Sequence, residues 1–457
     1  MKYLEKIIEY GLYLFVFLLP LQTRWIIKAG ETEYLTYSLY GTDILLLLVL
    51  VLFVIFKILN FKFSIKFLIS NFQTIPKSLR TNHQSLTRWL VGGLVLASAV
   101  SIFSASDKLL ALYKFGWLIM GVGLFWLIIS ANYSKLKIIY ALLAGVFLQA
   151  VLGIWQFLTQ SSFANKWLGM AFHNPSDLGV SVVETVGLDG VGERWLRAYG
   201  GLDHPNMFGG MLAVGMLFAI ILLIAKVHKV KSLATSYFLL ATFSMALFFS
   251  FSRTAWSGLI VGLVAMIALA IINKNLFWLK QLGKIVLVMG ILFFLLFSQY
   301  QNLIITRARG EGRLEVKSMA ERLMSYQDGW LLIKDNWLTG VGMGNYTLSI
   351  GDKELEISPA APAWSYQPVH NVFLLVWGEI GIIGLIFFIS IIIYLIILNL
   401  KFFRQDHESQ MSVILNLSIL SVLIILLNFD HWLWSLHFGA LFFWLIMGVV
   451  YNFKSRN

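Results

Sequence analysis

The chain has 457 residues, of which 59% are hydrophobic and 13% are charged, and it contains no cysteine. A soluble globular protein is about a quarter charged, so this composition excludes a soluble globule and indicates an integral membrane protein. The net charge of +12 does not indicate a nucleic-acid partner, because the basic residues fall mainly in short segments between apolar runs. The absence of cysteine excludes disulfides and thiolate metal sites.

Twelve segments have the length and hydrophobicity of membrane-spanning helices, which need about 20 mostly apolar residues. The first follows Lys2 and Lys6 and lacks a small-residue cleavage site, so we expect it to be retained. We therefore predict an all-α polytopic membrane protein with about 12 transmembrane helices, forming one integral membrane domain over residues 1–457. The expected spans are 5–22, 41–59, 89–105, 111–130, 137–158, 205–225, 233–251, 255–273, 284–300, 369–400, 411–428 and 433–451.

The distribution of lysine and arginine predicts the orientation of these spans. An even number of spans puts both termini on one side, and the segments of that side hold 20 of the 35 basic residues. Seven of the other 15 lie in the long segment 299–367, and long loops carry less topological weight. We therefore expect cytoplasmic termini and two long outer loops, at 159–204 and 299–367.

The outer segment 299–367 contains the signs of an interfacial helix. Ser318 and Glu321 have the spacing of a capping box. Apolar residues at helical spacing follow and predict a helix at the membrane interface; they are Leu323, Tyr326, Trp330, Ile333 and Trp337. The glycine-rich residues 340–345 predict a turn after this helix, since a nucleotide-binding loop would need a preceding strand and a following Lys-Ser/Thr.

One polar motif joins Arg197 to His204-Pro205-Asn206 at the start of the sixth span. Asp203 is the expected helix N-cap, and Pro205 suits the first turn. The N-terminus of a helix offers free N–H groups to an anion. The alternative is that Arg197 reaches lipid phosphates and that the other residues only cap the helix.

Two further motifs, Ser252-Arg253 and His370-Asn371, also lie at outer ends of spans. A charged residue beside apolar spans usually faces a cavity or a partner, although Arg253 could also extend to the interface. His370 can abstract a proton near neutral pH, or it is an ordinary polar cap of the tenth span.

Other polar residues near these ends have open interpretations. Glu379 lies nine residues after His370, on the opposite side of the helix and about 13 Å along it, so the two cannot pair. We interpret Glu379 as a packing residue, with neutralisation of an arginine as the alternative. Asp430 and His431, with Trp432, Trp434 and His437, either line the same cavity or form an aromatic belt.

Taken in chain order, the motifs resemble the O-antigen ligase and polymerase family of bacterial membrane glycosyltransferases. The resemblance covers about residues 195–385, and the first five spans resemble the family only in hydropathy. The matching pieces are Arg197, Gly201 and His204-Pro-Asn206; Ser252-Arg253; Arg322, Trp330 and Trp337-Leu-Thr-Gly-Val-Gly-Met-Gly344; and His370-Asn371 with Glu379-Ile-Gly381.

The resemblance implies a location in the bacterial cytoplasmic (inner) membrane, with the outer loops in the periplasm. It also implies inverting transfer of a glycan from undecaprenyl pyrophosphate to an acceptor hydroxyl at the outer face of that membrane, with no metal and no cofactor. It implies catalytic roles for three residues. Arg197 and Arg253 would hold the pyrophosphate, and His370 would be the base or would position the acceptor. The expected substrate-binding residues are Arg322, His204, Asn206, Asn371, Asp430 and His431.

The acceptor and one competing function stay open. The acceptor could be the lipid A core of lipopolysaccharide, another lipid-linked repeat as in a polysaccharide polymerase, or a protein or wall polymer. A transporter or flippase of lipid-linked sugars would use the same substrate, but it predicts charges midway through the bilayer and internal symmetry. We expect membrane lipids and no nucleic acid as partners, and we predict no oligomeric state.

Overall fold

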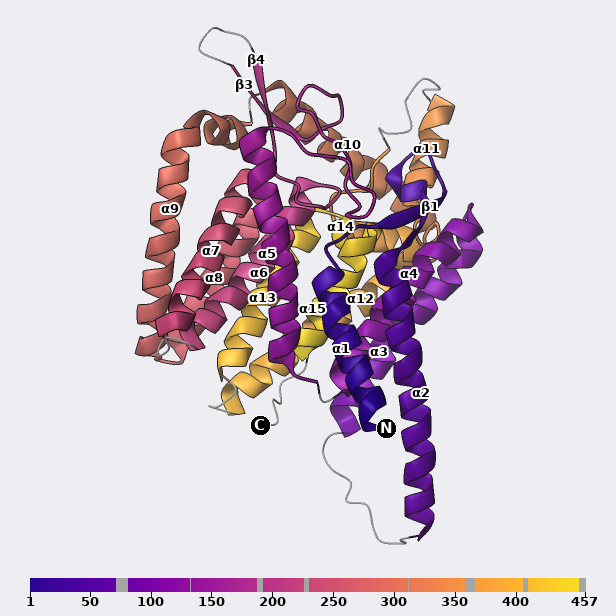
Figure 1. Ribbon diagram of the computed structural model, residues 1–457. Helices are drawn as coiled ribbons and strands as arrows, with labels where there is room; N and C mark the ends of the chain where they lie inside the picture. The colour runs from indigo at the N-terminus through magenta and orange to yellow at the C-terminus, as the bar shows by residue number, and fades with distance from the viewer. Residues whose placement is uncertain are drawn as a thin grey trace.

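The computed structural model describes residues 1–70, 81–131, 133–186, 192–225, 230–310, 312–357, 366–405 and 410–451. Figure 1 shows a bundle of long helices with both chain termini at one end and the strands, α10 and α11 at the other. The strands are β1 (Arg24–Lys28), β2 (Tyr37–Tyr40), β3 (Val182–Val186) and β4 (Gly192–Leu196). The helices are α1 (Lys2–Leu18), α2 (Gly41–Ser70), α3 (Thr81–Ser101), α4 (Lys108–Ser130), α5 (Lys135–Thr159), α6 (Pro205–Ala225), α7 (Val230–Ser250), α8 (Arg253–Ile272), α9 (Leu276–Arg309), α10 (Arg313–Asn336), α11 (Tyr346–Ile357), α12 (Val372–Gln405), α13 (Gln410–Phe429), α14 (Trp432–Ser435) and α15 (His437–Tyr451), with short 3₁₀ turns at Glu33–Leu35 and Ile102–Ser104.

The helical, polytopic architecture is confirmed, because ten of the described helices are long and apolar enough to cross a membrane. Each of the twelve predicted spans overlaps a helix. Two of those helices are shorter than a usual span: α1 has 17 residues and α15 has 15. The last predicted span, 433–451, is divided between α14 and α15 at Leu436.

Helix α6 is the central helix of the bundle. It has no charged residue and is apolar around its whole circumference, which is typical of a helix that is buried on all sides. Residues from Pro205 to Ile224 are buried, and α5, α7, α8 and α13 pack against them. Because α6 is central, the polar residues at its N-terminus lie in the middle of one end of the bundle.

Helix α10 confirms that residues 323–336 are helical but corrects the start and the buried face of the predicted helix. The helix begins at Arg313 rather than at the predicted capping box, because α9 already ends in a left-handed turn at Gly310. The five predicted apolar positions do not share one surface. Ile333 is 1% exposed and faces the bundle, whereas Leu323 is 63% exposed and Trp330 is 46% exposed.

The glycine-rich segment that follows α10 forms the predicted turn. It packs against a break within α12. Gly381 has φ +72° and ψ 178°, a conformation essentially restricted to glycine. The amide of Ile382 donates to the carbonyl of Trp337 over 2.9 Å, and the amide of Gly342 donates to the carbonyl of Glu379 over 2.9 Å. These bonds fix the end of α10 against α12.

The segment 159–204 contains an antiparallel hairpin, β3–β4, which was not predicted from the sequence. Its second strand leads directly to Arg197, whose amide donates to the carbonyl of Ser181 over 3.2 Å. The next amide, of Ala198, donates to the carbonyl of Phe249 over 2.9 Å. The hairpin therefore holds Arg197 against the end of α7.

Candidate active site

The predicted motifs meet at the end of the bundle where α6 begins, and an amide links two of them. The guanidinium of Arg197 donates from Nε to the carbonyl of Ser250 over 2.8 Å and from Nη2 to Oδ1 of Asn206 over 2.8 Å. Nδ2 of Asn206 donates to Oδ2 of Asp430 over 2.9 Å. The network therefore connects the start of α6 with the turn after α13.

Arg197 is a buried cation with neutral hydrogen-bond partners. Arg197 is only 5% exposed. Burial, together with the charge of Arg307, lowers the pKa of Arg197 well below its usual value. A guanidinium nevertheless stays protonated in proteins. The lowered pKa therefore means that the buried positive charge of Arg197 is unfavourable by itself and that a bound anion would stabilise it.

His204 caps α6, which corrects the expectation that Asp203 does so. Nδ1 of His204 accepts from the amide of Asn206 over 3.1 Å, and Nε2 lies 3.2 Å from Oγ of Ser181. The ring therefore takes the capping position beside Pro205. Burial, helped by the charge of Arg197, lowers the pKa of His204 to about 3. Both ring nitrogens of this neutral histidine are occupied by protein groups.

A second group of residues consists of His370 and the turn after α13. The rings of His370 and His431 meet edge to face with centroids 5.1 Å apart. Nδ1 of His431 lies 2.7 Å from Oγ of Ser435. Nδ1 of His370 is buried and has no hydrogen-bond partner within the described parts of the chain. Burial and the charges of His431 and Arg322 lower the pKa of His370 to about 3.

Asp430 supplies the negative charge of this group. Burial alone would raise its pKa, but the neighbouring His431 and His370 hold the pKa of Asp430 below its usual range. Oδ1 also accepts from the amide of His431 over 2.9 Å. Since Trp432 is 1% exposed and Trp434 is 7% exposed, these residues line the interior of the protein and do not form an aromatic belt.

Arg253 lies in a separate ionic group with Arg307 and Glu315. Of these three residues, only Arg253 was predicted from the sequence. Nη1 of Arg253 donates to the carbonyl of Arg307 over 3.1 Å, and Nη2 lies 3.2 Å from Oε2 of Glu315. Glu315 also pairs with Arg307. Arg307 and Glu315 were not predicted as site residues from the sequence. The available signal was a charged pair that flanks the junction of two helices in the outer segment.

Arg322 acts electrostatically on both the arginine group and the histidine group. Its positive charge lowers the pKa of Arg197 and of His370, and its buried Nε has no hydrogen-bond partner in the described chain. Asn371 has a structural position instead. Its Oδ1 accepts from the amide of Leu374 over 3.0 Å, and its Nδ2 donates to the carbonyl of Asn428 over 3.2 Å.

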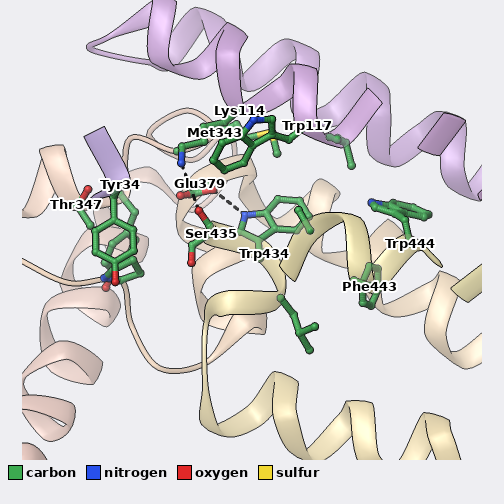
Figure 2. A pocket seen from close by; sticks show the side chains of 16 residues that line it. Tyr34, Lys114, Trp117, Met343, Thr347, Glu379, Trp434, Ser435, Phe443 and Trp444 are labelled. Carbon is green, nitrogen blue, oxygen red and sulfur yellow. Dashed lines mark hydrogen bonds between the residues drawn. The ribbon is translucent and has the colours of Figure 1, made fainter. Parts of the chain in front are cut away.

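Glu379 lines a pocket together with Lys114, Trp434 and Ser435 (Figure 2). Within the described residues, no hydrogen bond or ion pair joins it to Arg197, Arg253 or Arg322. Oε2 of Glu379 accepts from Nε1 of Trp434 over 2.8 Å. In the same pocket, Nζ of Lys114 donates to the carbonyl of Ser435 over 3.3 Å and lies 3.9 Å from the ring centroid of Trp117. These contacts are those of a packing residue, as we interpreted Glu379.

The fold and the site thus define a polytopic α-helical membrane protein with buried arginines and histidines at one end of its bundle. Residues 238–389 match the family model described as O-antigen ligase. The match confirms the predicted resemblance to this family and includes Arg253, Arg322 and His370. Arg197 and Asp430 lie outside the matched segment. No curated protein matches the chain.

Proposed function

We propose that the protein is an O-antigen ligase-like glycosyltransferase of the bacterial cytoplasmic membrane. It transfers a glycan from undecaprenyl pyrophosphate to an acceptor hydroxyl at the outer face. The observation that carries this proposal is the charge of Arg322 acting on His370, whose buried Nδ1 has no hydrogen-bond partner among the described residues. The family match supports the same class of reaction.

The arginines suit the departure of a pyrophosphate. As the bond from the anomeric carbon to the phosphate oxygen breaks, negative charge grows on the leaving group. Guanidinium groups supply permanently charged, bidentate donors to phosphate oxygens, and donors preorganised in a dry site stabilise developing charge strongly. Arg197, Arg253 and Arg322 would bind the donor in this way without a metal ion.

His370 would accept the proton of the attacking hydroxyl on Nδ1 while the acceptor oxygen attacks the opposite face of the sugar, which inverts the anomeric centre. A pKa of about 3 makes His370 a weak base in the donor-free protein. A bound pyrophosphate adds negative charge nearby, and an opposite charge favours the protonated imidazole. Donor binding would therefore strengthen the base for the step that follows.

The test uses the full-length protein in lipid vesicles with an undecaprenyl-pyrophosphate glycan and candidate acceptors. We expect Arg253→Ala and His370→Ala to lower the transfer rate by about 100-fold or more. The matched control is Arg309→Ala, which removes an exposed arginine near the same junction. Undiminished transfer in both site variants would exclude the proposed site.

The product also separates the two related activities. A single transfer to a lipid A core identifies a ligase, and a ladder of lengthening glycans identifies a polymerase of the same family. Movement of the lipid-linked donor across the vesicle membrane without any transfer would identify a transporter instead.

A further inference from the structure

The arginine group at the junction of α9 and α10 already contains an anion. Glu315, in the first turn of α10, is 3% exposed. One carboxylate oxygen lies 3.2 Å from Nη2 of Arg253, and the other pairs with Nη1 of Arg307. A carboxylate that bridges two guanidiniums occupies the position that an oxyanion of a phosphate would take between them.

Arg307 is held rigidly but keeps an unused donor. Its Nη2 donates to the carbonyl of Phe251 over 3.1 Å, in the turn between α7 and α8, where Phe251 has φ +47°. Among the residues that the structure describes, the buried Nε atoms of Arg307 and Arg322 have no hydrogen-bond partner. Buried N–H groups are rarely left unpaired, so the group is arranged for further acceptors.

Among the described residues, one carboxylate pairs with two arginines of this group. Glu315 is the carboxylate that pairs with Arg253 and Arg307, and the charges of Arg307 and Arg322 act on Arg197. A pyrophosphate diester brings two negative charges. The side chain of Arg253 is 35% exposed, against 11% for Arg307 and 4% for Glu315. An anion from outside would therefore meet Arg253 first and Glu315 next.

We propose that Arg307 is an additional pyrophosphate-binding residue and that Glu315 is an internal anion, displaced from Arg253 and Arg307 when the donor binds. The identity of the donor rests on the proposed function. Two anions cannot share one pair of guanidiniums without strong repulsion. Glu315 would therefore keep the arginines ordered in the empty site and lower the affinity for the donor. Its release would also couple donor binding to the first turn of α10.

The test measures binding of inorganic pyrophosphate to the purified full-length protein in detergent. We expect Glu315→Gln to bind pyrophosphate more tightly by on the order of tenfold, because the competing charge is removed. Adding Arg307→Gln should abolish this gain. The matched control is Glu321→Gln, which removes an exposed carboxylate of the same helix, paired with Lys317 at 3.6 Å, and should leave the affinity unchanged.

Equal or weaker binding by Glu315→Gln, or no binding by either protein, would overturn the inference, since Glu315 would then only hold the arginines. If Glu315→Gln lowers the thermal midpoint, pyrophosphate should restore it, and failure to do so would also overturn the inference. The transfer assay separates the two proposals. If Glu315→Gln binds pyrophosphate more tightly but the wild type transfers no glycan, only the proposed glycosyltransferase function is contradicted. If the wild type transfers glycan but Glu315→Gln does not bind pyrophosphate more tightly, only the proposed role of Glu315 is contradicted.

Discussion

The amide of Asn206 is the residue-scale link between the two halves of the site. It accepts from Arg197 through Oδ1 and donates to Asp430 through Nδ2. An amide can satisfy a cation and an anion at once without carrying charge itself. Arg197 and Asp430 thus keep fixed orientations while their charges stay available to a substrate.

We predict that Asn206→Ala lowers both stability and transfer. The substitution leaves the buried groups of Arg197 and Asp430 without this partner, which costs about 1–3 kcal/mol per unsatisfied group. The thermal midpoint in detergent and the transfer rate measure the two effects. Asn302→Ala on α9, where the side chain is exposed, is the control. Equal behaviour of the two variants would contradict the role of Asn206 as a link.

The lowered pKa of His370 predicts an unusual pH profile. Its neutral form persists as the pH falls below 6.5, the ordinary value of histidine, and is lost only near pH 3. We expect kcat/KM for the donor, which reports the free enzyme, to show no loss centred on pH 6.5. Initial rates between pH 5 and pH 8 test this. A decline centred near 6.5 that disappears in His370→Gln would contradict the prediction.

At the scale of elements, the broken helix α12 connects the two groups of the site. Its first residues follow His370, and its break holds the segment after α10, the helix that carries Glu315 and Arg322. The amide of Val341 adds a bond to the carbonyl of Gly378 over 2.9 Å. The position of the arginines relative to the histidine therefore depends on this backbone junction.

We predict that Gly381→Ala is strongly destabilising. Its φ of +72° disfavours any side chain, and a Cβ there would lie 2.0 Å from the carbonyl oxygen of Leu338. A loss of about 2–3 kcal/mol or more is expected, seen as a lower thermal midpoint and reduced transfer. The control is Gly290→Ala in α9, where a Cβ meets nothing within 4 Å. An unchanged midpoint in Gly381→Ala would contradict the constraint.

At the scale of the whole molecule, the bundle separates the chain termini from the site. Figure 1 places both termini at the end opposite α10 and the β3–β4 hairpin. Charge distribution predicts that the end with the termini is cytoplasmic. The site would then face the side to which lipid-linked glycans are delivered, away from cytoplasmic nucleotides.

Reporter fusions test this orientation. Alkaline phosphatase is active only outside the cytoplasm, so we expect a fusion after Gln160, at the end of α5, to be active. A fusion after Ala225, at the opposite end of α6, should be inactive. Green fluorescent protein at the C-terminus should fluoresce. The reverse pattern would place the site in the cytoplasm and would contradict the proposed donor.

The class of protein, most of the helices and the positions of the principal polar motifs could be predicted from the sequence alone. Spanning helices are recognisable because the bilayer requires a long apolar segment, and this is a local property of the chain. Arg253 and His370 were recognisable because polar residues are costly beside apolar spans. The family match over residues 238–389 agrees with that interpretation.

Which polar groups meet could not be predicted from the sequence, because it depends on how distant helices pack. Asn206 and Asp430 are 224 residues apart, and the pairing of Glu315 with Arg253 depends on how α8, α9 and α10 pack. Hydrogen bonds and ion pairs act over a few ångströms and leave no periodic trace in the sequence. The cap of α6 was expected at Asp203 because the sequence offers two polar residues before Pro205, and the contact of the His204 ring with Ser181, 23 residues away, favours His204. The β3–β4 hairpin was not predicted.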